Sequence, residues 1–201
     1  MTSTPPSPTV APADGTLGIL CVGLGAVTTT LIAGVELAKR GEADPVGSLT
    51  QLGTIRIGKR TEDNVPRIKD FVPLAGLDQI VFGAWDPYPD DAYTAAVRAG
   101  VLETGRHLEG IADTLRSIRP MPAAFDPAYV KRLEGTNVMA DTSKRAMLEQ
   151  VRADIQAFRD EHLCDRMVMI WAGSTEVYIE PGPTHADLQA FEAAIDAGDP
   201  S

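Results

Sequence analysis

The stretch LGILCVGLGAVTTTLIAG, residues 17–34, decides the fold. Its first six residues form a continuous apolar run with the length of a buried strand, and Gly23 and Gly25 end that run. Helical spacing of apolar residues follows over 28–39, and Gly41 is placed to cap the end of that helix. The stretch therefore predicts a strand, a glycine turn and a helix. The expected inner face of the helix consists of Leu31, Val35 and Ala38, with Ile32 beside them.

The glycine turn is compatible with a phosphate-binding loop and with an ordinary structural turn. Two glycines after a strand leave backbone N–H groups open to a pyrophosphate, and the helix dipole favours the same negative charge. Thr28 stands where a third glycine is usual, and the hydroxyls of Thr28 and Thr29 are candidate phosphate donors. The glycines alone do not decide between the two interpretations. A membrane span is disfavoured, because Gly, Thr and Glu36 lower the hydrophobicity of the run.

The rest of the chain alternates strand and helix. Strands are predicted at 53–57, from Asp78 through the run QIVFGAW, and at 166–171, where the run RMVMIW indicates a third buried strand. Three strands each followed by helix predict an α/β fold with a mostly parallel sheet. Residues 1–15 are rich in Pro, Ser and Thr and are expected to be a disordered tail, so the domain is predicted to cover 16–201. The helices are predicted at 90–99, 103–119, 143–163 and 184–197.

The last two of these helices have predicted caps and inner faces. Asp141, Thr142 or Ser143 can cap the helix at 143–163. Thr184 with Asp187 resembles a capping box for the last helix. The expected inner stripes are Leu148, Val151, Ile155 and Phe158 in the first of the two and Leu188, Phe191 and Ile195 in the second.

Three strand ends carry glycine or polar residues: GLGAVT, AWDPYP and AGSTE. Ligands of such folds bind at the carboxyl ends of strands, so these segments are predicted to converge on one ligand. Asp86 ends the second strand and is either a ligand-binding acid or the cap of the following turn. The polar run from Ser174 to Glu176 is interpreted from the residues alone as a turn.

Composition excludes several classes of function. The formal net charge of −10 disfavours binding of nucleic acid. Cys21 and Cys164 lie in or beside apolar runs and are expected to be buried free thiols, which suits a reducing cytoplasm. The three histidines are scattered without metal-ligand spacing, so no metal is assigned, and no nucleophile–base pair stands out.

The order of several segments resembles one family. The chain is similar to the inositol-3-phosphate synthases (myo-inositol-1-phosphate synthases), above all the bacterial forms, over roughly residues 15–200. The combination of GSLTQ, GAWD and WAGSTE in this order is far more specific than a glycine pattern. The matching segments are VGLGAVTTTLIAG (22–34), GSLTQLGTIRIG (47–58), VFGAWDPYPDDAYTAAVRAGVLE (81–103), RPMPAAFD (119–126), VRADIQAF (151–158) and MIWAGSTEVY (169–178).

The resemblance implies a Rossmann-type NAD-binding domain, whose sheet is completed by later chain, and a homotetrameric enzyme of inositol and phospholipid biosynthesis. It also implies a reaction. NAD oxidises C5 of glucose 6-phosphate, an enolate closes the ring on C1, and the same NADH reduces C5 again. The hydride carrier takes the difficult step, while the protein positions it and stabilises charge.

The resemblance also implies cofactor contacts, here carried over by motif. The pyrophosphate loop would be Gly23, Gly25, Ala26, Val27 and Thr28, although eukaryotic members carry Asn where this chain has Val27 and Thr28. Asp86 would be the acid of the adenosine ribose. Ala123 and Ala124 match a further contact, where eukaryotic members carry Ser and an aliphatic residue. The WAGSTE segment would line the cofactor with Ala172, Gly173, Ser174 and Thr175.

Catalytic residues are not assigned. Family members are longer chains whose catalytic lysines follow the WAGSTE segment, whereas all five lysines here precede it and match no catalytic motif. The chain is therefore expected to be the N-terminal, NAD-binding part of a synthase and to be inactive alone. The alternatives are a non-catalytic NAD-binding or assembly fragment and a net NAD-dependent dehydrogenase on a related fold.

Overall fold

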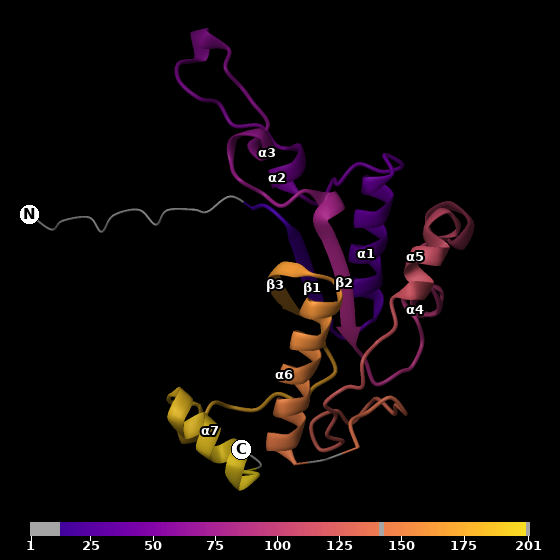
Figure 1. Ribbon diagram of the computed structural model, residues 1–201, viewed down its shortest axis with the longest axis vertical. Helices are drawn as coiled ribbons and strands as arrows, with labels where there is room; N and C mark the ends of the chain where they lie inside the picture. The colour runs from indigo at the N-terminus through magenta and orange to yellow at the C-terminus, as the bar shows by residue number, and fades with distance from the viewer. Residues whose placement is uncertain (1–12, 141–142, 200–201) are drawn as a thin grey trace, which may run out of the picture.

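The structure, a computed structural model, describes residues 13–140 and 143–199. Its described residues form a sheet of three parallel strands, β1 (Thr16–Val22), β2 (Ile80–Trp85) and β3 (Cys164–Trp171), in the order β2-β1-β3. This confirms the predicted α/β class with a parallel sheet (Figure 1). The helices are α1 (Ala26–Lys39), α2 (Leu49–Leu52), α3 (Ile68–Phe71), α4 (Ala92–Ala99), α5 (Ala112–Ser117), α6 (Lys144–Glu161) and α7 (Leu188–Ala197). None of them is both long enough and apolar enough to cross a membrane.

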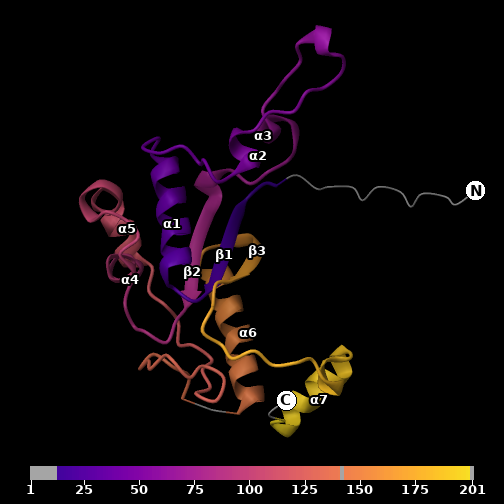
Figure 2. The same ribbon diagram turned by 180° about the vertical axis from the view of Figure 1, so that it is seen from behind.

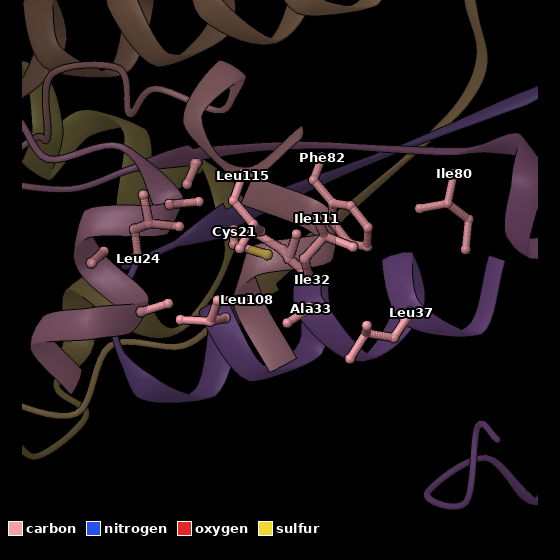
Figure 3. Packing of buried hydrophobic residues seen from close by; sticks show 14 residues of the cluster. Cys21, Leu24, Ile32, Ala33, Leu37, Ile80, Phe82, Leu108, Ile111 and Leu115 are labelled. Carbon is pink, nitrogen blue, oxygen red and sulfur yellow. The ribbon is translucent and has the colours of Figure 1, made fainter. Parts of the chain in front are cut away.

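Helices cover both faces of the sheet (Figures 1 and 2). On one face, α1, α4 and the segment ending in α5 enclose the larger cluster, in which Ile32, Phe82 and Leu115 meet around the sulfur of Cys21 (Figure 3). On the other face, α6 places Phe158 against Leu20. Coverage of both faces explains why β1 and β2 read as continuous apolar runs.

The inner face of α1 differs from the predicted stripe. Leu31 is 36% exposed, and the residues buried against the sheet are Thr28, Thr29, Ile32, Ala33, Glu36 and Leu37. Small threonines let the start of the helix approach the strands, which an apolar-periodicity argument does not detect. The buried Glu36 is compensated because Lys39 Nζ lies 2.6 Å from its carboxylate. The end of the helix is as predicted, since Gly41 has φ +70° and its N–H donates to the carbonyl of Ala38.

The predicted strand at 53–57 is wrong. These residues follow α2 in an arm that projects from the body of the molecule, defined here as residues 49–71 (Figure 1). Within the described chain, the arm has one antiparallel bridge, between Thr54 and Arg67, and no partner strand from the sheet. Alternating Ile55 and Ile57 imitate a strand pattern, but without a second apolar surface to cover them they remain a loop.

The predicted helix at 103–119 is broken. A π-helical turn at Thr104–Leu108 and a 3₁₀ turn at Glu109–Ile111 precede α5. At the start of this segment, Nδ1 of His107 accepts the backbone N–H of Glu103 at 3.0 Å. Such a local side-chain bond competes with regular helix hydrogen bonding.

The C-terminal third of the chain is more exposed than predicted. In β3, Val168, Met169 and Trp171 are 45–66% exposed, because the strand lies at the edge of the sheet. The last helix begins at Leu188, where Asp187 accepts the N–H of Ala190 at 2.8 Å, so the expected capping box from Thr184 is wrong. Its expected inner stripe is not buried either, since Leu188 is 72% exposed.

The long helix α6 follows the prediction. Ser143 caps it by accepting the N–H of Ala146, and Val151, Ile155 and Phe158 face the sheet. The other two candidate caps, at 141 and 142, lie outside the described residues. Cys21 and Cys164 are buried free thiols, as expected. The expected tail at 1–15 falls outside the described residues except for 13–15.

Candidate functional site

The three strand ends singled out in the sequence meet at one cavity. It has a volume of about 790 Å³, within the usual range of small-molecule sites, and lies where the carboxyl ends of the strands open. The glycine turn forms one wall, and the residues after β2 and β3 form others. A fourth wall, from 123 to 133, is contributed by the loop before α6.

The glycine turn is held from both sides. Gly23 has φ +96°, a conformation that favours glycine, and its N–H donates to the carbonyl of Trp85 at 2.8 Å. The Thr28 hydroxyl donates to the carbonyl of Gly23 at 2.6 Å, and the Thr29 hydroxyl donates to the carbonyl of Gly25 at 2.9 Å. Because both threonines are buried and their hydroxyl protons are used inside the turn, the expectation that these hydroxyls donate to phosphate is wrong.

The start of α1 is open. Gly25 occupies the cap position, no side chain caps the helix, and the first turn carries no acidic residue. A Cβ placed on Gly25 would have no neighbour within 4 Å, so free space lies beside this backbone. The first N–H groups of any helix have no partner within it, and the helix dipole adds positive potential. This end of α1 can therefore bind an anion.

Asp86 braces the turn against β2. The residue is 8% exposed, and its carboxylate accepts two backbone N–H groups, that of Leu24 on Oδ2 at 2.6 Å and that of Tyr88 on Oδ1 at 2.9 Å. The turn-capping interpretation is thus present in the structure, and a bond to the glycine turn accompanies it. Each carboxylate oxygen can accept a further hydrogen bond, so a ribose hydroxyl is compatible with this arrangement.

Asn137 is a structural residue of the site that the sequence analysis missed. Its side-chain amide donates to the carbonyls of Asp86 (2.9 Å) and Met121 (3.1 Å), and its backbone N–H donates to the carbonyl of Pro87 (2.9 Å). The loop approaches so closely that a Cβ on Gly135 would lie 2.2 Å from the Pro87 carbonyl oxygen. These bonds hold the segment containing buried Ala123 beside the end of β2. In the sequence, the one indication of this turn is the run Gly135-Thr136-Asn137, whose residue types favour turns.

Ten of the twelve predicted cofactor contacts line the cavity. Val27 and Thr28 do not, since Val27 is 70% exposed on the outside of α1 and Thr28 is buried beneath the turn. The ten are Gly23, Gly25, Ala26, Asp86, Ala123, Ala124, Ala172, Gly173, Ser174 and Thr175.

Aromatic residues of the lining were not predicted. They are Trp85, Tyr88, Phe125, Tyr129 and Trp171. The Arg98 guanidinium lies 4.5 Å from the centre of the Tyr88 ring and pairs with Asp90, which fixes the ring at the rim. An aromatic and aliphatic lining beside an anion-binding turn suits a ligand that combines flat rings with phosphate.

Among the residues that the structure describes, no histidine and no cysteine lines the cavity. Burial raises the pKa of the nearby Cys21 thiol, an effect that its hydrogen bond with Thr28 partly offsets, so the thiol is neutral at ordinary pH. None of the five lysines lines the cavity, and the part of the chain that the structure describes has no cluster of three or more metal-ligating side chains.

The parallel sheet, the glycine turn between β1 and α1, and a cavity at the strand ends define a Rossmann-type nucleotide-binding domain. A family model of the NAD-binding part of myo-inositol-1-phosphate synthase matches residues 17–201. The chain therefore belongs to the myo-inositol-1-phosphate synthase family, and NAD is the cofactor that this match assigns to it.

Curated relatives are synthases with longer chains. Inositol-3-phosphate synthase 1 of Bacteroides thetaiotaomicron is 46% identical over 187 residues, which cover 92% of this chain and 43% of the relative. Inositol-3-phosphate synthase 1 of Oryza sativa subsp. japonica is 32% identical over 81% of this chain and 34% of the relative. The chain thus spans less than half the length of these relatives.

Solved structures show the same fold. An inositol-3-phosphate synthase of Caenorhabditis elegans superposes with a TM-score of 0.83 at 24% identity, over 92% of this chain and 40% of that one. A myo-inositol-1-phosphate synthase-related protein of Thermotoga maritima has a TM-score of 0.57 at 17% identity with the same coverage.

Proposed function

We propose that this chain supplies the NAD-binding part of an enzyme that converts glucose 6-phosphate to 1D-myo-inositol 3-phosphate. The observation that carries the proposal is the cavity, in which the glycine turn, Asp86 and the segment after β3 face one another. The 46% identity to a bacterial inositol-3-phosphate synthase supports the choice of this reaction over others on a nucleotide-binding fold.

In this proposal, bound NAD accepts hydride from C5 of the sugar phosphate and returns it after the ring has closed, so that the conversion is an isomerisation. The residues of this chain bind and orient. The backbone of Gly23, Gly25 and Ala26, continued by Val27 and Thr28, holds the pyrophosphate at the start of α1. Asp86 accepts from the adenosine ribose while it braces the turn. Ala123 and Ala124, with the segment from Ala172 to Thr175, close over the cofactor.

We propose further that the isolated chain binds NAD without turning over substrate. The described cavity offers Arg98 as a basic side chain but no lysine that could act on the sugar. These 201 residues alone are therefore expected to behave as a non-catalytic, NAD-binding fragment, which is one of the alternatives that the sequence leaves open. The whole enzyme would work as a homo-oligomer, a tetramer by family resemblance, in the cytoplasm, where the two free thiols stay reduced.

An activity assay tests the proposal. The chain is incubated with glucose 6-phosphate and catalytic NAD, and inositol phosphate and NADH are both measured. We expect neither product from the chain alone. Formation of inositol phosphate would contradict the proposed lack of turnover, and accumulation of NADH would show a net dehydrogenase instead.

A further inference from the structure

Arg98 places a positive charge at the rim of the cavity that the proposed NAD contacts leave unused. Among the described residues that line the cavity it is the one basic side chain, beside the acidic Asp86, Asp126 and Glu176. It stands on the last turn of α4, and its guanidinium lies 4.5 Å from the centre of the Tyr88 ring. The backbone N–H of Tyr88 in turn donates to Oδ1 of Asp86 at 2.9 Å. Arg98 is thus linked through Tyr88 to the acid that is proposed to bind the adenosine ribose.

A cation beside a ribose-binding acid bears on which dinucleotide the cavity takes. NADP differs from NAD by a phosphate on the 2′ oxygen of the adenosine ribose. Nucleotide-binding domains that take NAD carry an acid at this position, and those that take NADP carry an arginine nearby. Arginine binds phosphate through two N–H groups at once and keeps its charge at any ordinary pH. This chain has both groups at one rim, so its selectivity depends on whether the Arg98 guanidinium is free to turn to a 2′-phosphate.

The guanidinium is not free, because Asp90 holds it. Nη1 of Arg98 pairs with Oδ2 of Asp90, a residue that does not itself line the cavity. The ion pair and the Tyr88 ring together fix the guanidinium in one position at the rim. The Asp90 carboxylate also offsets the positive charge that would attract a phosphate.

We propose that Asp90 is a specificity-determining residue, which makes the cavity select NAD over NADP by holding Arg98 on Tyr88. The inference rests on the proposed function, in which the adenosine ribose lies beside Asp86. The carboxylate of Asp86 accepts from the 2′ hydroxyl of NAD and repels a phosphate at that oxygen. Asp90 keeps the rim arginine from compensating for this repulsion. The class of ligand that the cavity rejects is therefore a 2′-phosphorylated adenine dinucleotide.

Competition between the two dinucleotides tests the proposal. NAD is titrated by calorimetry into the unchanged chain and into Asp90→Ala, and the affinity of NADP is measured by its displacement of NAD. Asp90→Ala is expected to lower the ratio of the Kd of NADP to the Kd of NAD by at least about fivefold, the factor that corresponds to an exposed ion pair. A general loosening of the fold would weaken both dinucleotides alike and leave this ratio unchanged. In the double variant Asp90→Ala with Arg98→Ala, the fall is expected to disappear, because no guanidinium remains to meet the phosphate.

The chain offers a matched control outside the cavity. Arg116 pairs with Asp113 and lies 4.3 Å from the centre of the Tyr93 ring, so this trio repeats the arrangement at the rim, but none of its members lines the cavity. Asp113→Ala removes the same charge and is expected to leave the ratio of the two Kd values unchanged.

Three results would overturn the inference while NAD binding stands. They are an unchanged ratio in Asp90→Ala, a fall that persists after Arg98→Ala, and an equal fall in Asp113→Ala. NADP that displaces NAD from neither chain counts as an unchanged ratio. Failure of the unchanged chain to bind NAD would overturn the proposed function together with this inference.

Discussion

Asp86 joins two backbone segments that the glycine turn needs in fixed positions. Its carboxylate accepts one N–H from Leu24 in the turn and one from Tyr88 after β2. An amide in its place keeps one acceptor and leaves the other N–H opposite a donor. A buried N–H without a partner costs about 1–3 kcal/mol. Asp86→Asn is therefore expected to lower the free energy of unfolding by about that amount, measured by urea denaturation.

A matched control is available next to the same turn. Asp90 pairs with Arg98 at the surface, where an exposed ion pair is worth at most about 1 kcal/mol. Asp90→Asn is therefore expected to cost clearly less than Asp86→Asn. Equal costs for the two variants would show that the bond to Leu24 does not brace the turn.

The Cys21 thiol gives the fold a pH dependence. Burial raises its pKa above the ordinary value of 9.0, so the folded state favours the neutral thiol. The contribution of the neutral thiol to the free energy of unfolding is complete below about pH 9, near the pKa of the unfolded chain. It is lost as the pH rises from there through the higher pKa of the folded chain. Cys21→Ala has no thiol to ionise. The stability difference between the unchanged chain and this variant is thus expected to shrink from about pH 7 to about pH 10. A constant difference would contradict the assigned burial.

Helix α6 packs closely against the sheet at Gly83. A Cβ there would lie 2.6 Å from Cε2 of Phe158 and 2.8 Å from Cδ2 of Leu20. Gly83→Ala is expected to lower the free energy of unfolding by about 1–3 kcal/mol, because helix and strand must move apart. Thermal or urea denaturation measures the change.

Gly34 is the opposite case within α1. A Cβ there meets nothing within 4 Å, and its helical backbone suits alanine. Gly34→Ala is expected to raise the free energy of unfolding by about 0.5–1 kcal/mol, since glycine is the poorer helix former. If both substitutions destabilised the chain alike, the close packing of α6 on β2 would not be the cause.

Elements with local signals were predictable, and elements shaped by distant partners were not. The apolar runs identified β1 and β2, and the three candidate caps at 141–143 located the start of α6, where the structure uses Ser143. The strand predicted from the alternation at 53–57 does not form, because no strand of the described sheet pairs with the arm. The prediction that the apolar stripe of α7 is buried was wrong. Periodicity shows that one face of a helix is apolar, but it does not show that another part of the described chain covers that face.

The same division holds for the site. Glycines and polar strand ends could be found in the sequence because parallel topology brings strand ends together. The role of Asn137 could not, because it depends on a loop that returns from residue 137 to the end of β2. The threonines show a further limit: their hydroxyls looked available to a ligand, but only the fold reveals that they close the turn.

The molecule as a whole combines a cavity at the strand ends with large exposed surfaces. The cavity is assembled entirely from the described residues, from Val22 in β1 to Glu176 after β3. By contrast, the edge strand β3 and the outer face of α7 leave apolar side chains in solvent. Exposed apolar surface of this kind suits a domain that makes contacts with more protein.

Calorimetric titration of NAD into the unchanged chain and into Gly25→Ala is the most direct test of the proposed pyrophosphate loop. The structure accommodates the added methyl group, since nothing lies within 4 Å of it and the backbone φ is −88°. The melting temperature is therefore expected to stay nearly the same, while the methyl occupies the approach to the first N–H groups of α1. We predict that the unchanged chain binds NAD and that Gly25→Ala binds it at least about tenfold more weakly, a loss of about 1.4 kcal/mol. Failure of the unchanged chain to bind millimolar NAD, or equal affinity of the two chains, would contradict the account.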